Sequence, residues 1–275
     1  MSAELWVNQN SEHVRDTSDY YPTDPRAVRA AYNELARLAP DFAPARVLDP
    51  GAGDGPWGEE AQRIWRRPYI VGVELRPEVP AHPAYDEWFR GSFISLPTPK
   101  EPKGPWKTEK AEERARAQYA FDLWAGEQPV WSPRPASEVD ARWLGYEIFD
   151  LVVGNPPYGK ARQFVEDAMA VLRPGGWLMF LLRLGFLAGQ ARAKELYRQY
   201  PLRHCAVLAQ RPSFSGDGKT DAEEYGIFFF QKGFVGQWTG SQLLYDDPPP
   251  IKRQASVFRT QTTPKVPVLA QLSLF

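Results

Sequence analysis

Two short segments of the chain carry residues whose types and spacing suit chemistry on a small molecule. The first is Asp49-Pro-Gly-Ala-Gly-Asp-Gly55 and the second is Asn155-Pro-Pro-Tyr158. Each follows a short apolar run that predicts a buried strand. Ligands in open α/β sheets bind beyond the carboxyl ends of the strands, so both segments stand where a site is expected.

The glycine turn predicts a ligand-binding loop of a particular kind. Glycines let the backbone turn tightly and approach a ligand, and the helix that follows offers free N–H groups. The spacing from Gly51 to Gly55 is G-x-G-x-G, whereas the dinucleotide fingerprint is G-x-G-x-x-G. The preceding acid, Asp49, suits a ligand with an ammonium group better than a pyrophosphate. Glu74 lies 23 residues after Gly51 at the end of the next predicted strand, where its carboxylate can accept hydrogen bonds from both hydroxyls of a ribose. A tight turn without a ligand is the alternative.

The Asn-Pro-Pro-Tyr segment suits a planar substrate that carries an NH2 group. Pro156 and Pro157 fix the backbone and remove two N–H donors. The Asn155 side-chain oxygen and the Pro156 carbonyl remain as acceptors, and Tyr158 adds a flat aromatic face. Two acceptors on an amino group favour a more nucleophilic nitrogen, which can then displace a leaving group from an electrophilic methyl. The alternative is a rigid turn that ends the strand, with Asn155 as a local cap.

The apolar periodicity predicts alternating strands and helices, and hence a doubly wound α/β sheet that positions both segments. Asp24 and Pro25 predict the start of an amphipathic helix. Helices are expected over residues 25–39, 57–66 and 190–199, and one whose core face is Val165, Ala168, Met169 and Leu172. Strands are expected over residues 46–48, 69–75, 149–154, 177–182, 202–209 and 225–231.

The composition narrows the class of protein. The 275 residues include 43% apolar side chains, enough for a sizeable core, and 33 Lys and Arg nearly cancel 34 Asp and Glu. This balance excludes a globally basic nucleic-acid coat but leaves room for a local basic groove. One cysteine and three histidines argue against a disulfide and a structural zinc site. The N-terminus lacks the features of a signal peptide and no apolar stretch is long enough to span a bilayer, so a cytoplasmic protein is expected.

Two segments depart from the alternation. Residues 94–147 are rich in Pro, Trp and charge, and are too long for a plain loop, so an insertion with its own structure is expected. Within it, Ala117, Ala120, Phe121 and Trp124 predict a helix with one apolar face. Residues 246–275 are interpreted as an extended tail that follows a catalytic domain over residues 1–245.

Together, the glycine turn, Glu74 and Asn-Pro-Pro-Tyr resemble the class I S-adenosylmethionine-dependent amino-methyltransferases, and within these the DNA adenine-N6 methyltransferases. The resemblance covers about residues 19–232. It implies a seven-stranded, mostly parallel sheet with a reversed last strand, and S-adenosylmethionine as the cofactor. The segment Tyr20-Tyr-Pro-Thr-Asp-Pro25 resembles the family's upstream cofactor motif, and Pro212-Ser-Phe214 resembles the motif whose aromatic stacks on a flipped base.

The resemblance also implies a role for particular residues. Cofactor-binding residues would be Tyr21, Thr23, Asp49, Pro50, Gly51, Gly53, Glu74, Ser92, Phe93 and Asn155. Residues that hold the target base would be Asn155, Pro156, Pro157 and Tyr158, with Phe214 on the opposite side of the base, or alternatively as a hydrophobic loop anchor. Ser92 stands where the family often has an acid that binds the cofactor's adenine. The chain also has no room for a large target-recognition domain, so recognition would depend on the insertion and on residues 211–224.

The last five residues, Gln271-Leu-Ser-Leu-Phe275, resemble the pentapeptide with which bacterial DNA polymerases and repair proteins bind the sliding clamp. Gln271 would make a polar contact, while Leu272, Leu274 and Phe275 would supply the apolar anchor. A terminal strand or a core-packed end is the alternative. A clamp motif would favour DNA as substrate and a bacterial or phage setting.

The sequence therefore predicts a metal-free DNA adenine-N6 methyltransferase that acts on a flipped base. One alternative is an enzyme of the same fold that methylates ribosomal RNA or a protein glutamine, since Asn-Pro-Pro-Tyr suits these amino groups too. Another is a clamp-tethered DNA-binding protein without activity, against which the intact motifs argue. Any DNA affinity should fall with salt, with Lys160, Arg162, Arg211 and Lys219 as candidate phosphate contacts.

Overall fold

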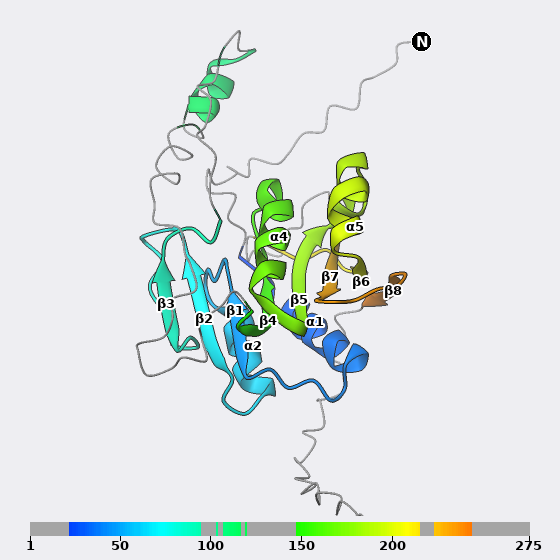
Figure 1. Ribbon diagram of the computed structural model, residues 1–275. Coiled ribbons are helices and arrows are strands. Elements are labelled where there is room, and N and C mark those ends of the chain that lie inside the picture. The colour runs from blue at the N-terminus through cyan, green and yellow to red at the C-terminus, as the bar shows by residue number, and fades with distance from the viewer. Residues whose placement is uncertain are drawn as a thin grey trace, which may run out of the picture.

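The computed structural model of the protein describes residues 22–94, 103, 107–116, 119, 147–214 and 223–243. Within these ranges the chain forms one sheet with helices on both of its faces (Figure 1). The expected α/β class is therefore confirmed.

The sheet contains eight strands in the order β3-β2-β1-β4-β5-β7-β6-β8. Strands β3, β2, β1, β4 and β5 are parallel, and β7 runs antiparallel to both β5 and β6. The expected reversed strand is therefore present, but the expected number of seven is wrong, because β8 pairs in parallel with β6 and extends the sheet. The strands are β1 (Arg46–Asp49), β2 (Tyr69–Glu74), β3 (Glu87–Arg90), β4 (Phe149–Gly154), β5 (Leu172–Arg183), β6 (Leu202–Leu208), β7 (Tyr225–Gln231) and β8 (Thr239–Leu243).

Both faces of the sheet are covered by helices. One apolar cluster joins α1 and α2 to the sheet, and a second joins α4 and the turns before β6 to the opposite face. The helical elements are α1 (Pro25–Leu38), α2 (Pro56–Ile64), η2 (Tyr158–Lys160), α4 (Ala161–Val171), η3 (Leu184–Leu187), η4 (Arg192–Leu196) and α5 (Tyr197–Gln199).

Alternating side chains of the central strands fill the two clusters. In β5, Leu178 and Phe180 face the α4 side, whereas Met179 and Leu181 face the α1 side. All four are fully buried. A strand that is buried on both faces reads as a continuous apolar run, which explains why the sequence pattern identifies these strands well.

The predicted helices and strands agree with the structure in place and type, with small shifts at their ends. Asp24 caps α1 as expected, since its side chain accepts a hydrogen bond from the Arg26 N–H at 2.9 Å. The strand expected from Trp177 begins earlier, at Leu172, because the backbone of Gly175 and Gly176 pairs with Lys232. In the insertion, residues 109–116 are helical. The helix prediction in the insertion depends on Ala117, Ala120, Phe121 and Trp124. These four residues lie outside the residues that the structure describes.

A buried polar cluster attaches the unexpected strand β8 to the sheet. The His204 ring on β6 contacts the Thr239 hydroxyl at 2.7 Å and the Ser241 hydroxyl at 3.0 Å, both from β8. The Glu34 carboxylate on α1 accepts from the Ser241 hydroxyl at 2.7 Å and lies 2.8 Å from His204 Nε2. These bonds satisfy groups that would otherwise be buried without partners, so they hold β8 in register.

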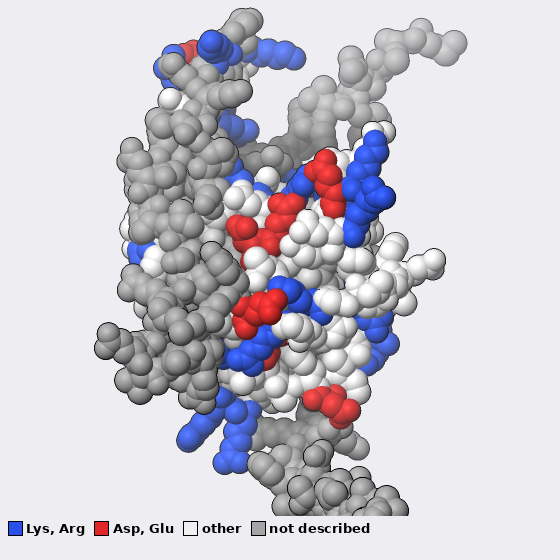
Figure 2. All heavy atoms as spheres, in the orientation of Figure 1, with Lys and Arg blue, Asp and Glu red and all other residues white. Residues whose placement is uncertain are grey.

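Charge is mixed over the part of the surface that the structure describes. Figure 2 shows acidic and basic side chains side by side on this face, without one large area of a single sign among the residues in colour. This agrees with the formal net charge of -1. No helix in the described ranges combines the length and apolar character that a bilayer crossing requires.

Candidate active site

The two motif segments meet at one edge of the sheet. Strands β2, β1 and β4 are neighbours and run in parallel, so their carboxyl ends, Glu74, Asp49 and Gly154, lie along the same edge. The turn from β1 to α2 begins directly after Asp49, and Asn155 follows Gly154. This is the arrangement that the sequence predicted.

The glycine turn is held close to the sheet by its own backbone. Gly53 and Gly55 have φ of 50° and 85°, a conformation that favours glycine. Gly55 is also the N-cap of α2, where a Cβ would lie 2.5 Å from the His82 ring. The Ala52 N–H donates to the Val73 carbonyl at 3.0 Å, which fastens the turn to β2. The predicted glycine turn and the helix that follows it are therefore both present.

Asp49 is fully buried at the start of this turn. It accepts a hydrogen bond from the Tyr85 hydroxyl at 2.7 Å and one from the Gly51 N–H at 3.4 Å. Burial raises the pKa of Asp49 to about 7, although these two bonds act in the opposite direction. The Asp49 carboxyl, which was expected to attract an ammonium group, therefore gains or loses its negative charge near neutral pH.

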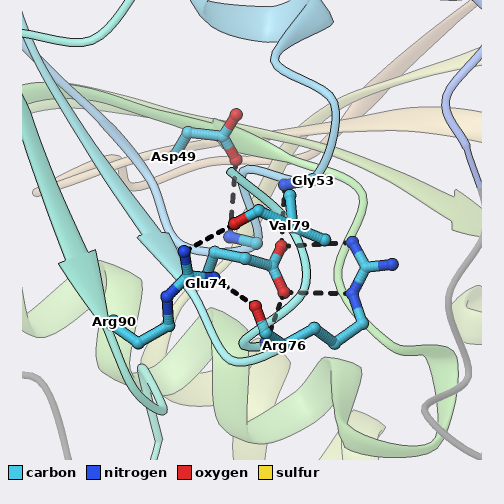
Figure 3. Close-up of polar contacts among 7 residues, drawn as sticks. Asp49, Gly53, Glu74, Arg76, Val79 and Arg90 are labelled. Carbon is cyan, nitrogen blue, oxygen red and sulfur yellow. Dashed lines mark hydrogen bonds and ion pairs between the residues drawn. The ribbon is translucent and has the colours of Figure 1, made fainter. Parts of the chain in front are cut away.

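Glu74 is also buried, and both of its oxygens are engaged (Figure 3). Oε1 accepts from the Arg76 backbone N–H at 2.8 Å and from Arg76 Nε at 3.0 Å. Oε2 accepts from the Gly53 N–H at 2.9 Å and from Arg76 Nη2 at 3.4 Å. Glu74 therefore connects the glycine turn to the loop that follows β2, and the Arg76 side chain covers its carboxylate.

Arg90 holds that same loop from β3. Its guanidinium donates to the backbone carbonyls of Arg76 and Val79, as Figure 3 shows. The Gly91 N–H donates to the Glu74 carbonyl at 2.9 Å. The backbone around Glu74 is thus fixed by the neighbouring strand.

Thr23, from the upstream motif over residues 20–25, contacts Asn155 of the Asn-Pro-Pro-Tyr segment. The Asn155 amide Nδ2 donates to the Thr23 hydroxyl at 3.2 Å. Next to Thr23, burial alone would raise the pKa of Asp24, but bonds from Arg26 and from the Ser213 backbone hold it below its usual range. The start of α1 therefore lies between Asn155 and the loop that carries Phe214.

The aromatic residues of the predicted base site share a neighbour. The Tyr225 ring at the start of β7 lies 5.6 Å from the Tyr158 ring and 5.0 Å from the Phe214 ring, between centroids. The Arg183 guanidinium, at the end of β5, lies 4.9 Å from the Tyr158 ring centroid. The structure brings Phe214 and Tyr158 to one region, with Tyr225 in contact with both.

The other predicted site residues lie in different settings. Ser92 is buried and donates its hydroxyl hydrogen bond to the Ile94 carbonyl at 2.7 Å. Phe93 packs into the core beside Phe164, with ring centroids 5.4 Å apart. Pro50 and Pro156 are buried, whereas Pro157 is half-buried. Tyr21, Lys219 and the clamp-like residues Gln271, Leu272, Leu274 and Phe275 lie outside the residues that the structure describes.

Four residues of this region were not identified from the sequence: Tyr85, Arg76, Arg183 and Tyr225. Tyr85 comes from the loop between β2 and β3, 36 residues after its partner Asp49, and no local pattern marks it. Arg76 could have been identified from its position, because it lies two residues after Glu74, the predicted ribose-binding acid. Arg183 and Tyr225 pair across β5 and β7, and that pairing depends on the tertiary register.

No metal-binding cluster is found in the described ranges, where no three His, Cys, Asp or Glu side chains gather as ligands would. The single cysteine, Cys205, is buried, and burial raises its pKa to about 12. Its thiol is therefore protonated at neutral pH and packs as an apolar side chain.

No protein-family profile matches the chain, and no curated protein sequence matches it. Solved structures with a similar arrangement include a Listeria monocytogenes protein described as a class I S-adenosylmethionine-dependent methyltransferase. That likeness has a TM-score of 0.49 at 12% identity and covers 84% of this chain and 68% of that chain.

Two further structures extend the comparison. The M protein of the type I restriction enzyme EcoKI has a TM-score of 0.45 at 16% identity, with 86% of this chain and 51% of that chain covered. A Pyrococcus horikoshii protein described as an RNA methyltransferase has a TM-score of 0.42 at 16% identity, with 82% and 91% covered. All three likenesses concern the arrangement of the fold alone.

Proposed function

We propose that the protein transfers a methyl group from S-adenosylmethionine to the N6 amino group of an adenine flipped out of DNA. The observation that carries the proposal is the meeting of three features at one sheet edge. These are the glycine turn after Asp49, the carboxylate of Glu74, and Asn-Pro-Pro-Tyr with its Asn155–Thr23 hydrogen bond.

The residues of the glycine turn fit the cofactor. A Cβ at Gly51 would meet nothing within 4 Å, so the backbone there is open to a ligand. Asp49, when ionised, attracts the ammonium of the methionine end. Glu74 offers carboxylate oxygens to the ribose hydroxyls. Ser92 and Phe93 follow the end of β3 and Pro50 follows the end of β1, and we propose that they approach the cofactor from these positions.

Asn-Pro-Pro-Tyr supplies the second half of the reaction. When bound, S-adenosylmethionine would supply an electrophilic methyl: its C–S bond would break as the N–C bond forms, and the amino nitrogen would release a proton to solvent. The Asn155 oxygen and the Pro156 carbonyl accept hydrogen bonds from that amino group and orient its lone pair. Tyr158 and Phe214 stack against the base, which offsets the loss of stacking in the duplex.

DNA is favoured over RNA and protein glutamine by two features of the chain. Tyr20-Tyr-Pro-Thr-Asp-Pro25 precedes the glycine turn, and Thr23 contacts Asn155. The C-terminal Gln271-Leu-Ser-Leu-Phe275 suits attachment to the bacterial sliding clamp, which moves on DNA. On this proposal residues 1–245 are the methyltransferase domain with 94–147 inserted, and residues 246–275 are a tail.

The test is transfer of labelled methyl from S-adenosylmethionine to unmethylated genomic DNA, followed by identification of the modified nucleoside by mass. The matched variants are Asn155→Ala and Asn33→Ala; Asn33 is half-buried on α1, is not among the proposed site residues, and serves as control. N6-Methyladenine made by the parent and by Asn33→Ala, but not by Asn155→Ala, is the expected result. Cofactor binding without DNA methylation would contradict the DNA assignment and favour an RNA or protein substrate. Absence of cofactor binding would contradict the enzyme assignment.

A further inference from the structure

The Glu74 carboxylate carries a full complement of hydrogen bonds before any ligand arrives. A carboxylate offers about four lone-pair positions. Two are taken by backbone N–H groups, those of Gly53 and Arg76, and two by the Arg76 side-chain atoms Nε and Nη2. A ribose presents two adjacent hydroxyl donors, the same number that the Arg76 guanidinium supplies.

We propose that the Arg76 guanidinium is an internal stand-in for the ribose hydroxyls, and that the cofactor must displace it from Glu74 to bind. This inference rests on the proposed function, because it concerns the carboxylate to which the cofactor is assigned. It makes Arg76 a residue that sets cofactor affinity and that holds the Glu74 side chain in place in the free protein.

The side chain of Arg76 can leave while the backbone stays. Arg90 donates to the carbonyls of Arg76 and Val79, and the Arg76 N–H donates to Glu74, so the loop itself is anchored at three points. The Glu74 carboxylate keeps both backbone donors after the guanidinium has moved. The movement asked of Arg76 is a rotation of its side chain, which has four rotatable bonds.

When ribose hydroxyls replace the Arg76 guanidinium on Glu74, the number of hydrogen bonds stays the same but a positive charge is lost from the pair. The Arg76–Glu74 pair is largely buried, with 10% and 6% of the two side chains exposed. Displacement replaces a charge-assisted pair by two neutral hydroxyl donors, which are weaker partners. The pair therefore lowers the affinity for the cofactor while it stabilises the free protein, and its removal should do the reverse.

The experiment measures binding of S-adenosylhomocysteine by calorimetry, and the melting temperature with and without it. Arg76→Met keeps the apolar stem and removes the guanidinium. The matched control is Arg63→Met, which breaks a similar pair with the buried Glu60 on α2. We expect Arg76→Met to bind about tenfold more tightly than the parent, to melt lower when free, and to melt close to the parent when bound. Arg63→Met should melt lower with unchanged affinity.

Equal or weaker binding by Arg76→Met would overturn the inference, because it would show that the guanidinium stays on Glu74 or contacts the ligand. A second readout is made on the parent protein itself. The Nε–Hε signal of Arg76 in a nitrogen-15 spectrum of the parent, assigned by its absence in Arg76→Lys, should shift or broaden during titration with S-adenosylhomocysteine. A signal that does not change at saturation would also overturn it.

The two proposals fail in distinguishable ways. If the parent binds S-adenosylhomocysteine and Arg76→Met binds no more tightly, the inference about Arg76 is wrong but the assignment of the cofactor stands. If Arg76→Met binds and the parent does not, the inference is supported in a stronger form. If neither binds, the assignment of the cofactor fails and the inference falls with it.

Discussion

Asn155 donates its amide hydrogen bond to the hydroxyl of Thr23, at 3.2 Å and across 132 positions of sequence. Thr23 stands just before the N-cap of α1, and Asn155 stands just after β4. The bond fixes the orientation of the Asn155 amide and so decides which way its carbonyl oxygen faces. The start of α1 thereby becomes part of the site at the sheet edge.

Loss of the Thr23 hydroxyl should reduce methyl transfer. Thr23→Val keeps the shape of the side chain and removes the acceptor, so the Asn155 amide loses its orientation. A neutral hydrogen bond contributes about 0.5–1.5 kcal/mol, so single-turnover rates should fall roughly two- to tenfold. Thr23→Ser retains a hydroxyl and should keep most of the rate. Equal rates for Thr23→Val and the parent would show that the bond does not position Asn155.

The pH dependence of folding stability should carry the signature of Asp49. Burial raises its pKa to about 7, from an ordinary value of 3.8. A carboxyl whose pKa is higher in the folded chain binds more protons when folded, so between these two pH values stability falls as pH rises. Asp49→Asn cannot titrate and should flatten the pH dependence of the melting temperature between about pH 4 and pH 7 relative to the parent. Parallel curves for the two proteins would rule out a raised pKa at this residue.

Gly72 on β2 should not tolerate a side chain. A Cβ there would lie 2.8 Å from the Tyr85 ring and 2.9 Å from the Trp88 ring. Gly72→Ala should therefore destabilise the fold by about 1–3 kcal/mol in urea unfolding, as overpacked cores do. Gly185→Ala is the control, because a Cβ at Gly185 would meet nothing within 4 Å. Because Tyr85 bonds to Asp49, Gly72→Ala should also weaken cofactor binding.

Glu34 should be needed to hold strand β8. Burial alone would raise its pKa, but hydrogen bonds from Arg37, His204 and Ser241 hold that pKa well below its usual range. Glu34→Ala leaves the buried His204 and Ser241 without this partner and should cost about 3 kcal/mol in urea unfolding.

Hydrogen exchange adds a local readout for Glu34→Ala, since protection of the β8 amides should be lost first. Glu195→Ala, whose side chain is 59% exposed in the parent, should have almost no effect. Since the pKa of Glu34 is depressed on folding, its contribution should be present above about pH 4.5 and decline as the solution becomes more acidic. Unchanged β8 protection in Glu34→Ala would contradict this role.

The C-terminal pentapeptide predicts a separable function. Removal of residues 271–275 should abolish binding to a bacterial sliding clamp and leave methyl transfer to a short DNA duplex unchanged. Leu274→Ala combined with Phe275→Ala should act in the same way, because the apolar anchor is lost. Surface plasmon resonance on immobilised clamp is the measurement. Clamp binding that survives the truncation would exclude this segment as the attachment point.

Within the candidate site, local patterns identified the residues that act through the backbone or through a strand end. The tight turn that the glycine spacing predicted is present, with positive φ at Gly53 and Gly55, and Asp24 caps α1. Residues that act across the fold carried no such signal. Tyr85 reaches Asp49 from a loop, and Tyr225 reaches both Tyr158 and Phe214 from β7. The eighth strand was missed because Thr239–Leu243 is short, lies at the edge, and depends on a polar cluster from β6 and α1.

The sequence by itself determined the alternation of strands and helices, because strands buried on both faces are continuous apolar runs, and turns need glycine and proline. It also determined which residues stand at the carboxyl ends of β1, β2 and β4. Only the tertiary structure decided the charge state and availability of those residues. Desolvation sets the pKa of Asp49, and the Arg76 side chain covers Glu74, and both effects depend on distances between segments that no local pattern encodes.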